Sequence, residues 1–185
     1  DASHEPGVHG GLQFERIYGG PAELPREEEG YDAAAGTEFQ HGTFGRAAGT
    51  LQFDPAQPEK SALNVQIDMS NIQTTVDELN NTLKDVFKVV KYPTATFVST
   101  QIGKTGPNTG TVTGNLTIAG VTKPVTLNVT FNGGRDVPIP FQPYRIGFDA
   151  TGTIKRSDFG LNNMIWSGFV SDEVTLAIDC EMEKK

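Results

Sequence analysis

Cysteine is nearly absent from this sequence, since Cys180 is the only one among 185 residues. An intrachain disulfide is therefore excluded, and a disulfide framework cannot indicate the redox compartment. Cys180 lies on one face of the alternating run at residues 174–182. A thiol in that setting is expected to behave as a small buried hydrophobe, because no cationic neighbour would stabilise the thiolate of a nucleophile.

Long apolar runs and positive charge are also scarce. No run of 18 apolar residues occurs, so no helix is expected to span a bilayer. Fifteen basic residues stand against 23 acidic ones, which gives a net charge of -8. This charge repels polyanions at long range, and no basic amphipathic stretch is evident that would attach the chain to an anionic membrane. We therefore expect no nucleic acid partner and no stable membrane insertion.

Side chains suited to catalysis are few, with three histidines besides the single cysteine. His4 and His9 lie in the polar, glycine-rich start, where two histidines without further spaced ligands do not indicate a metal site. His41 could hydrogen-bond a ligand head group at a barrel rim, but a surface or structural role is favoured over it. We expect no catalytic residue and no metal. An enzyme acting on a bound lipid is kept as the less favoured alternative.

The chain is organised as a polar arm followed by one β-rich domain. Residues 1–10 predict a flexible arm, and residues 11–185 predict a single domain whose first strand covers residues 11–18. Residues 19–39 contain two prolines and three consecutive glutamates, which predicts an acidic insertion that could cover a barrel mouth. Apolar residues spaced by three and four over residues 74–84 predict one short helix.

Alternation of apolar and polar residues dominates the rest of the sequence. Short alternating runs are separated by glycine and proline turns, and about eight strands are predicted, with the helix between strands 3 and 4. Such strands each offer one apolar face, and closing the sheet removes exposed edges. The predicted fold class is therefore all-β, an eight-stranded antiparallel lipocalin-like barrel.

Four local strings carry a recognisable pattern: residues 49–55 (GTLQFDP), 91–99 (KYPTATFVS), 115–127 (NLTIAGVTKPVTL) and 154–160 (IKRSDFG). Together they resemble the YceI-like family of polyisoprenoid-binding proteins, which are bacterial lipocalin-like barrels typically exported to the periplasm. Their order and separations agree over about residues 42–183. The start differs, because the family's first hairpin with a His-Ser pair is replaced by GGLQFERIYGG and the acidic insertion.

The resemblance implies that a long-chain isoprenoid lipid, a polyprenyl chain or an isoprenoid quinone, is bound inside the barrel, with no catalytic cofactor. It also implies a periplasmic or secreted protein whose signal peptide has been removed. Burial of each methylene contributes about 0.8 kcal/mol, so a tail of a few isoprene units needs no charged contact. A structural or interaction barrel without lipid is the alternative. A homodimer remains open, because nothing in the sequence marks an interface.

The inward apolar side chains are the candidate lining of the lipid cavity, and small inward residues such as Ala95, Ser99, Gly114 and Ala150 are expected to leave room for the ligand. The candidate lining residues are Phe14, Phe44, Leu51, Phe53, Leu63, Val65, Ile67, Leu83, Phe87, Phe97, Leu116, Ile118, Leu127, Val129, Ile146, Phe148, Phe159, Trp166, Leu176 and Ile178.

Overall fold

The computed structural model describes residues 8–20, 42–44, 47–54, 56–74, 77–135, 145–162 and 171–184, and for residues 8–20 this description covers the backbone. Most of the expected N-terminal arm and of the acidic insertion lies outside these residues, as do His41 and Trp166. No helix in the described ranges is both long and apolar enough to cross a membrane.

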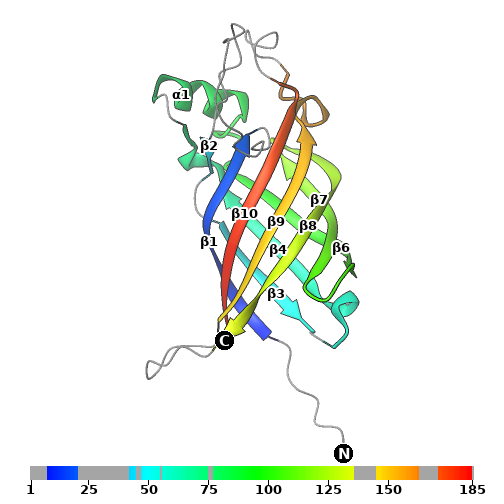
Figure 1. Ribbon diagram of the computed structural model, residues 1–185. Helices are drawn as coiled ribbons and strands as arrows, with labels where there is room; N and C mark the ends of the chain where they lie inside the picture. The colour runs from blue at the N-terminus through cyan, green and yellow to red at the C-terminus, as the bar shows by residue number, and fades with distance from the viewer. Residues whose placement is uncertain are drawn as a thin grey trace, which may run out of the picture.

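Eight antiparallel strands form a closed ring (Figure 1). Each strand pairs with the next strand of the ring, and β1 also pairs with β10, from Gly10 opposite Lys184 to Gly20 opposite Thr175. This last pairing closes the sheet and confirms the predicted eight-stranded barrel. The strands are β1 (Val8–Gly20), β3 (Ala47–Phe53), β4 (Ala62–Asp68), β6 (Thr94–Lys104), β7 (Thr109–Ile118), β8 (Val121–Arg135), β9 (Arg145–Lys155) and β10 (Glu173–Lys184).

The first strand is longer than the sequence pattern predicted. It was expected over residues 11–18, but β1 runs from Val8 to Gly20 because β10 pairs along one side of it and β3 along part of the other. Residues 8–10, assigned to the arm, and Gly19 and Gly20, assigned to the insertion, therefore belong to the barrel wall. Hydrogen bonding to two neighbours extends a strand beyond its apolar alternation.

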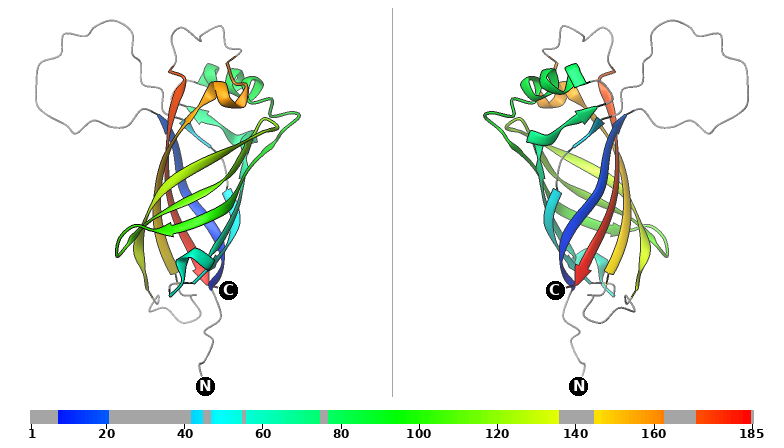
Figure 2. Two further views of the ribbon diagram at one scale, coloured as in Figure 1. Left: turned by 90° about the vertical axis from the view of Figure 1, so that its right-hand side faces the viewer. Right: turned by 90° about the vertical axis from the view of Figure 1, so that its left-hand side faces the viewer.

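Short elements gather mainly at one end of the barrel. The two-residue strands β2 (Gly42–Thr43) and β5 (Gln73–Thr74) extend the sheet there. The helix α1 (Asp77–Val86) follows β5 and confirms the predicted helix, although it begins three residues later than expected. Figure 2 shows α1 and η3 (Arg156–Phe159) at this same end. The 3-10 turn η2 (Met69–Asn71) leads into β5, whereas η1 (Pro58–Lys60) lies at the opposite end.

Three β-bulges interrupt the ladder of the barrel wall. The register shifts between Phe14 and Arg16 in β1, between Ser99 and Gln101 in β6, and between Phe131 and Gly133 in β8. A bulge adds one residue to one strand and increases its local twist. The three bulges therefore help this sheet to curl until its first and last strands meet.

Candidate functional site: the inner wall of the barrel

The inner wall is formed by alternate residues of each strand. In β7, for example, Val112, Leu116 and Ile118 are buried, whereas Asn115 between them is exposed. Among the described residues, no polar or charged side chain is buried. The wall is therefore apolar and can attract a ligand only through hydrophobic contact and shape.

The candidate lining residues divide into three groups. Buried in the core are Leu51, Val65, Phe97, Leu116, Ile118, Leu127, Ile146 and Phe159. Partly exposed and packed against that core are Phe44, Phe53, Leu63, Ile67, Leu83, Phe87, Val129, Phe148, Leu176 and Ile178. The side chain of Phe14 and all of Trp166 lie outside the described residues. Contact with a ligand stays a prediction for every member of the three groups.

One of the small inward residues, Gly114, does not leave room for a ligand. A Cβ atom added to Gly114 would lie 2.5 Å from Phe97 Cζ, so the Phe97 ring occupies that space. The expectation that Gly114 widens the cavity is therefore wrong. At Ser99 the hydroxyl oxygen accepts a hydrogen bond of 2.8 Å from the Leu63 backbone N–H, next to the β6 bulge. This hydroxyl extends the link between β4 and β6 where their ladder ends.

Ala150 lies at the centre of a cross-strand row in which space remains. Val129 of β8 and Ile178 of β10 pair with Ala150 on its two sides. Both keep accessible surface although they face inward, whereas Ile146 on the same face of β9 is only 3% exposed. Because Ile146 is almost fully buried on the same wall, the accessible surface of Val129 and Ile178 is attributed to their side chains and not to the strand backbone. The smallest side chain of this row thus lies between two larger ones that are not fully covered.

A second cross-strand row lies on the opposite wall, where the partly accessible residue stands between two alanines. In it, Ile67 of β4 is paired with Ala47 of β3 and Ala95 of β6, and Ile67 again keeps accessible surface. The order of strands places three strands between β4 and β9 in both directions round the ring. The Ala47 and Ala95 row therefore faces across the barrel toward the wall that carries Ala150.

Phenylalanine rings gather at both ends of the interior. Phe53, Phe131 and Phe148 meet at the end away from α1, with ring centroids 5.1 to 5.9 Å apart. At the α1 end, Phe44 and Phe87 meet edge to face at 5.7 Å. Phe131 was not among the candidate lining residues, although its alternation with Val129 signals the same inward face. Polarisable apolar rings therefore lie near each end of the interior.

Cys180 is the titratable group of the inner wall. Burial raises the pKa of its thiol to about 12, and the neighbouring carboxylates Asp179 and Asp149 add to the rise. The Sγ atom donates a hydrogen bond of 3.3 Å to the Phe148 carbonyl, which ties the thiol to the neighbouring strand β9. The thiol is neutral at physiological pH, as expected for a small buried hydrophobe. Within the described ranges, no group of three metal-ligating side chains comes together.

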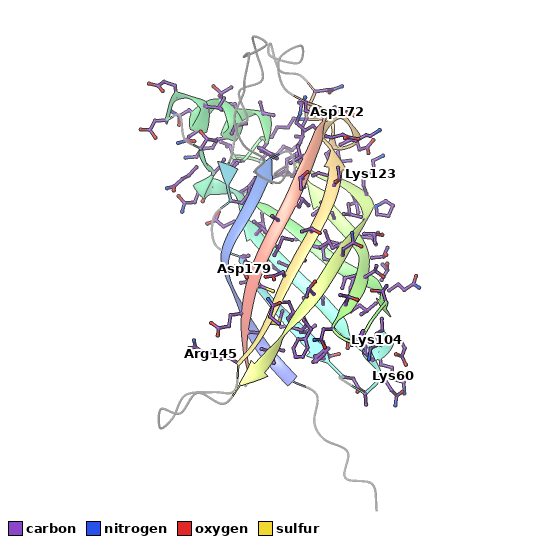
Figure 3. All side chains as sticks on the ribbon, in the orientation of Figure 1. Lys60, Lys104, Lys123, Arg145, Asp172 and Asp179 are labelled. Atoms are coloured by element: carbon purple, nitrogen blue, oxygen red, sulfur yellow. The ribbon has the colours of Figure 1, made fainter. Side chains whose placement is uncertain are left out.

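A groove of about 360 Å³ is lined by residues of β8, β9 and β10. Gly133 and Gly147 form its floor, where the lack of side chains leaves it hollow. At its rim Arg145 and Glu181 form an ion pair of 3.4 Å, and both side chains remain accessible. Figure 3 shows Arg145 on this face of the barrel, toward the end away from α1. An exposed pair of this kind stabilises the fold little.

Two of the four strings that carry the family resemblance meet in one contact, those at residues 91–99 and 115–127. The ring of Tyr92, from the Lys-Tyr-Pro string, lies so close to Gly120 that an added Cβ would be 2.7 Å from it. Gly120 has a φ of 81°, which glycine adopts without strain and other residues rarely adopt. The turn between β7 and β8 therefore requires glycine for two independent reasons. It packs against the segment that leads from α1 into β6.

The string at residues 154–160 packs at the α1 end of the barrel. Phe159 of η3 is 2% exposed and covers the core from that end. The Arg156 guanidinium donates to the carbonyls of Leu161 and Ser171, at 2.9 and 2.8 Å, and so ties η3 to the chain entering β10. Gly160 ends η3 in the left-handed region, with a φ of 68°. Arg156, Phe159 and Gly160 of this string thus each have a structural role in η3.

A closed antiparallel β-barrel with an apolar inner wall and a helix at one end defines a lipocalin-like protein. The model of the YceI-like domain matches residues 30–182. The chain belongs to the YceI-like family, as its local strings predicted.

Curated relatives agree with this assignment. The chain is 45% identical over 129 residues to a UPF0312 protein of Pseudomonas savastanoi pv. phaseolicola, covering 68% of this chain and 66% of the relative, just under two thirds of its length. A UPF0312 protein of Pseudomonas putida is 40% identical over 153 residues, covering 81% of this chain and 77% of the relative. Neither these names nor the family description indicates an enzyme.

Solved structures show the same fold. The crystal structure of a Campylobacter jejuni YceI protein has a TM-score of 0.70 and 30% identity, covering 89% of this chain and 94% of that one. That of Burkholderia cenocepacia BcnA has a TM-score of 0.69 and 26% identity, covering 90% and 94%. Both matches extend over nearly the whole barrel.

Proposed function

We propose that this barrel binds a long-chain isoprenoid lipid, a polyprenyl chain or isoprenoid quinone, in its interior and carries or stores it without chemical change. The observation that supports this best is the pair of facing rows centred on Ala150 and Ile67, in which Val129, Ile178 and Ile67 keep accessible surface. A wall without buried charge favours an extended hydrocarbon over a polar ligand. At about 25 cal/mol per Å² of apolar surface removed from water, such a tail binds tightly.

The location belongs to the same proposal. A lipid of this kind is too insoluble to cross an aqueous compartment alone, so a carrier is useful between two membranes. We infer a periplasmic or secreted protein on this ground and on the family resemblance. Fractionation of cells that produce the protein from its full natural precursor tests this, and retention in the cytosolic fraction would contradict it.

Native mass spectrometry with solvent extraction tests the binding itself. Protein purified without denaturation is expected to show a constant excess mass of several hundred daltons that extracts into hexane. A barrel that carries no excess mass after production in several hosts, and takes up no added polyprenol or quinone, would overturn the proposal in favour of a filled structural barrel.

Ala150→Phe gives the structural control for this experiment. The added ring would fill the space between Val129 and Ile178, so the excess mass is expected to disappear while the barrel remains folded. Thr151→Phe places the same ring on the exposed outer face of β9 and is expected to keep the bound mass. Ala47→Leu on the opposite wall provides a second inward variant should Ala150→Phe fold poorly, because overpacking a core is itself destabilising.

A further inference from the structure

The end of α1 is an unusual turn. The Val89 N–H donates to the Lys84 carbonyl at 2.9 Å, and the Lys88 N–H donates to the Asp85 carbonyl at 3.0 Å. These two bonds define a Schellman motif, in which the residue at the position of Lys88 is usually glycine. Lys88 takes the required left-handed conformation, with a φ of 53°. The sequence thus keeps a lysine where the backbone favours glycine.

The turn presents a fully exposed apolar residue. Val90 has a relative exposure of 102%, whereas Val89 beside it is buried and holds the turn against the core. Val98, at 44%, is the other strongly exposed large hydrophobic side chain in the described ranges. Exposure of a valine at the tip of a turn places it in reach of a partner, because no described part of the chain covers it.

Lysines surround that valine. Lys88 and Lys91 on either side of it are exposed, and Lys84 lies one helical turn earlier and is partly exposed. The Lys91 ammonium lies 5.1 Å from the centre of the Tyr92 ring, which holds it beside the turn. Three lysines stand against Asp85 in this segment, in a chain whose net charge is -8. We call the segment Lys84–Lys91 the basic turn.

The basic turn lies at the α1 end of the barrel, where η3 also lies (Figure 2). The basic turn does not appear as a basic face at helical spacing in the sequence, because Lys88 and Lys91 lie beyond the end of α1, in the Schellman turn and the residues that follow it. The acidic residues Asp77 and Glu78 are at the other end of α1 and are exposed. These two acidic side chains are therefore separated along α1 from the basic ones, which lie at and beyond its C-terminal end.

We propose that the basic turn is a docking surface for an anionic phospholipid membrane, with Val90 entering the head-group region and Lys84, Lys88 and Lys91 pairing with lipid phosphates. Charge complementarity supports this occupant, since a local positive patch of this kind is attracted within about one Debye length of about 10 Å. The contact is peripheral and places the α1 end of the barrel on the membrane. The proposal rests on the proposed function, because it identifies the end at which an apolar lipid would be exchanged.

Vesicle co-sedimentation with a matched pair of double variants tests the proposal. The protein is expected to bind vesicles of phosphatidylglycerol and phosphatidylcholine, but not phosphatidylcholine alone, and to dissociate as salt is raised. K88Q/K91Q should weaken this binding by roughly fivefold for each lysine removed. The control K60Q/K104Q changes the net charge equally at two exposed lysines of the opposite end, which Figure 3 labels, and should bind as the parent does.

Lys88→Gly separates docking from stability. Glycine relieves the left-handed backbone, so the melting temperature is expected to rise by about 1–3 °C while vesicle binding weakens. Val90→Ser should weaken binding without changing its salt dependence. Equal weakening by the two double variants, binding to neutral vesicles as strong as to anionic ones, or no vesicle binding by the parent would each overturn the proposal. The last result, with capture of a protein by the basic turn, would instead identify a protein partner.

Native mass spectrometry on the same variants distinguishes this proposal from the one it rests on. K88Q/K91Q should keep the bound lipid mass, and Ala150→Phe should keep vesicle binding. If the parent protein binds vesicles but carries no bound mass, lipid carriage is overturned and membrane docking is retained. If the parent protein carries a bound mass but binds no vesicles, membrane docking is overturned and lipid carriage is retained.

Discussion

Arg156 contacts two carbonyl groups that belong to different parts of the chain, those of Leu161 and Ser171. Removing the guanidinium leaves both without their donor at the end of the barrel. Arg156→Ala is expected to lower the free energy of unfolding by about 1–3 kcal/mol, the usual cost of losing hydrogen bonds to a charged group. Urea denaturation measures it. Arg156→Lys should recover only part of the loss, because one ammonium cannot reproduce the planar fork, and full recovery would contradict this role.

Asp172 lies beside η3, and the pKa of its carboxyl depends on hydrogen bonds from Ser157 of that turn. The Ser157 hydroxyl and backbone N–H donate to its two oxygens at 2.6 and 2.9 Å and hold the pKa of that carboxyl below 3.8. Because the folded pKa is depressed, the associated stability is present above pH 3.8 and is lost as pH falls through the folded value. NMR titration should show the Asp172 pKa rising in Ser157→Ala. An unchanged value would show that Ser157 is not the cause.

Cys180 tests the packing of the inner wall. Its pKa of about 12 predicts negligible reaction with Ellman's reagent in the native protein at pH 8, and rapid reaction in urea. Because the folded pKa is raised, the neutral thiol's contribution to stability is complete below pH 9 and is lost as pH rises toward 12. Fast labelling of the native protein would mean that water reaches this part of the wall freely.

At the scale of elements, regular alternation was the informative signal. The strands β4, β7, β8, β9 and β10 all coincide with alternating runs, because one face of each is packed and the other is solvated. Ile72 and Leu161 belong to the core but were not predicted, since they lie next to 3-10 turns that have no such period. The bulges were not predicted either. The position of an extra residue depends on the neighbouring strand as much as on the sequence of the bulged strand.

The candidate site was predictable to the same extent. Alternation identified which side chains face inward, so most of the predicted lining is in the core or packed against it. It could not identify where space remains, because that depends on which side chain fills which gap. Gly114 and Ala150 look alike in sequence, yet the Phe97 ring fills the space at Gly114, and Ala150 has partly accessible neighbours.

The turn between β7 and β8 gives a prediction at this scale. Gly120→Ala is expected to destabilise the barrel by about 2–4 kcal/mol, because it adds a clash with Tyr92 to the strain of a positive φ. Gly133→Ala, also at positive φ but with no atom within 4 Å of the added Cβ, isolates the strain and should cost about 1 kcal/mol. Thermal unfolding compares the two. Equal costs would remove Tyr92 from the explanation.

At the scale of the whole molecule, the closure of the barrel depends on a strand that the family model does not include. The model matches residues 30–182, whereas β1 covers Val8–Gly20 and pairs with both β10 and β3. The sequence placed this strand least well, because the long segment after it separates it from the regular pattern. Its partners are specified only when β10, at the other end of the chain, has formed.

A chain that begins at residue 21 would therefore have an open sheet. The edges of β10 and β3 would lose the partner they have in β1, and exposed strand edges pair with other molecules. We expect this variant to form dimers and larger species in size-exclusion chromatography with light scattering, and to lose any bound lipid. A chain that begins at Val8 keeps all of β1 and should retain the oligomeric state of the full chain. If the shorter chain behaved identically, β1 would be an accessory strand, and the remaining seven strands would have to enclose the interior by themselves.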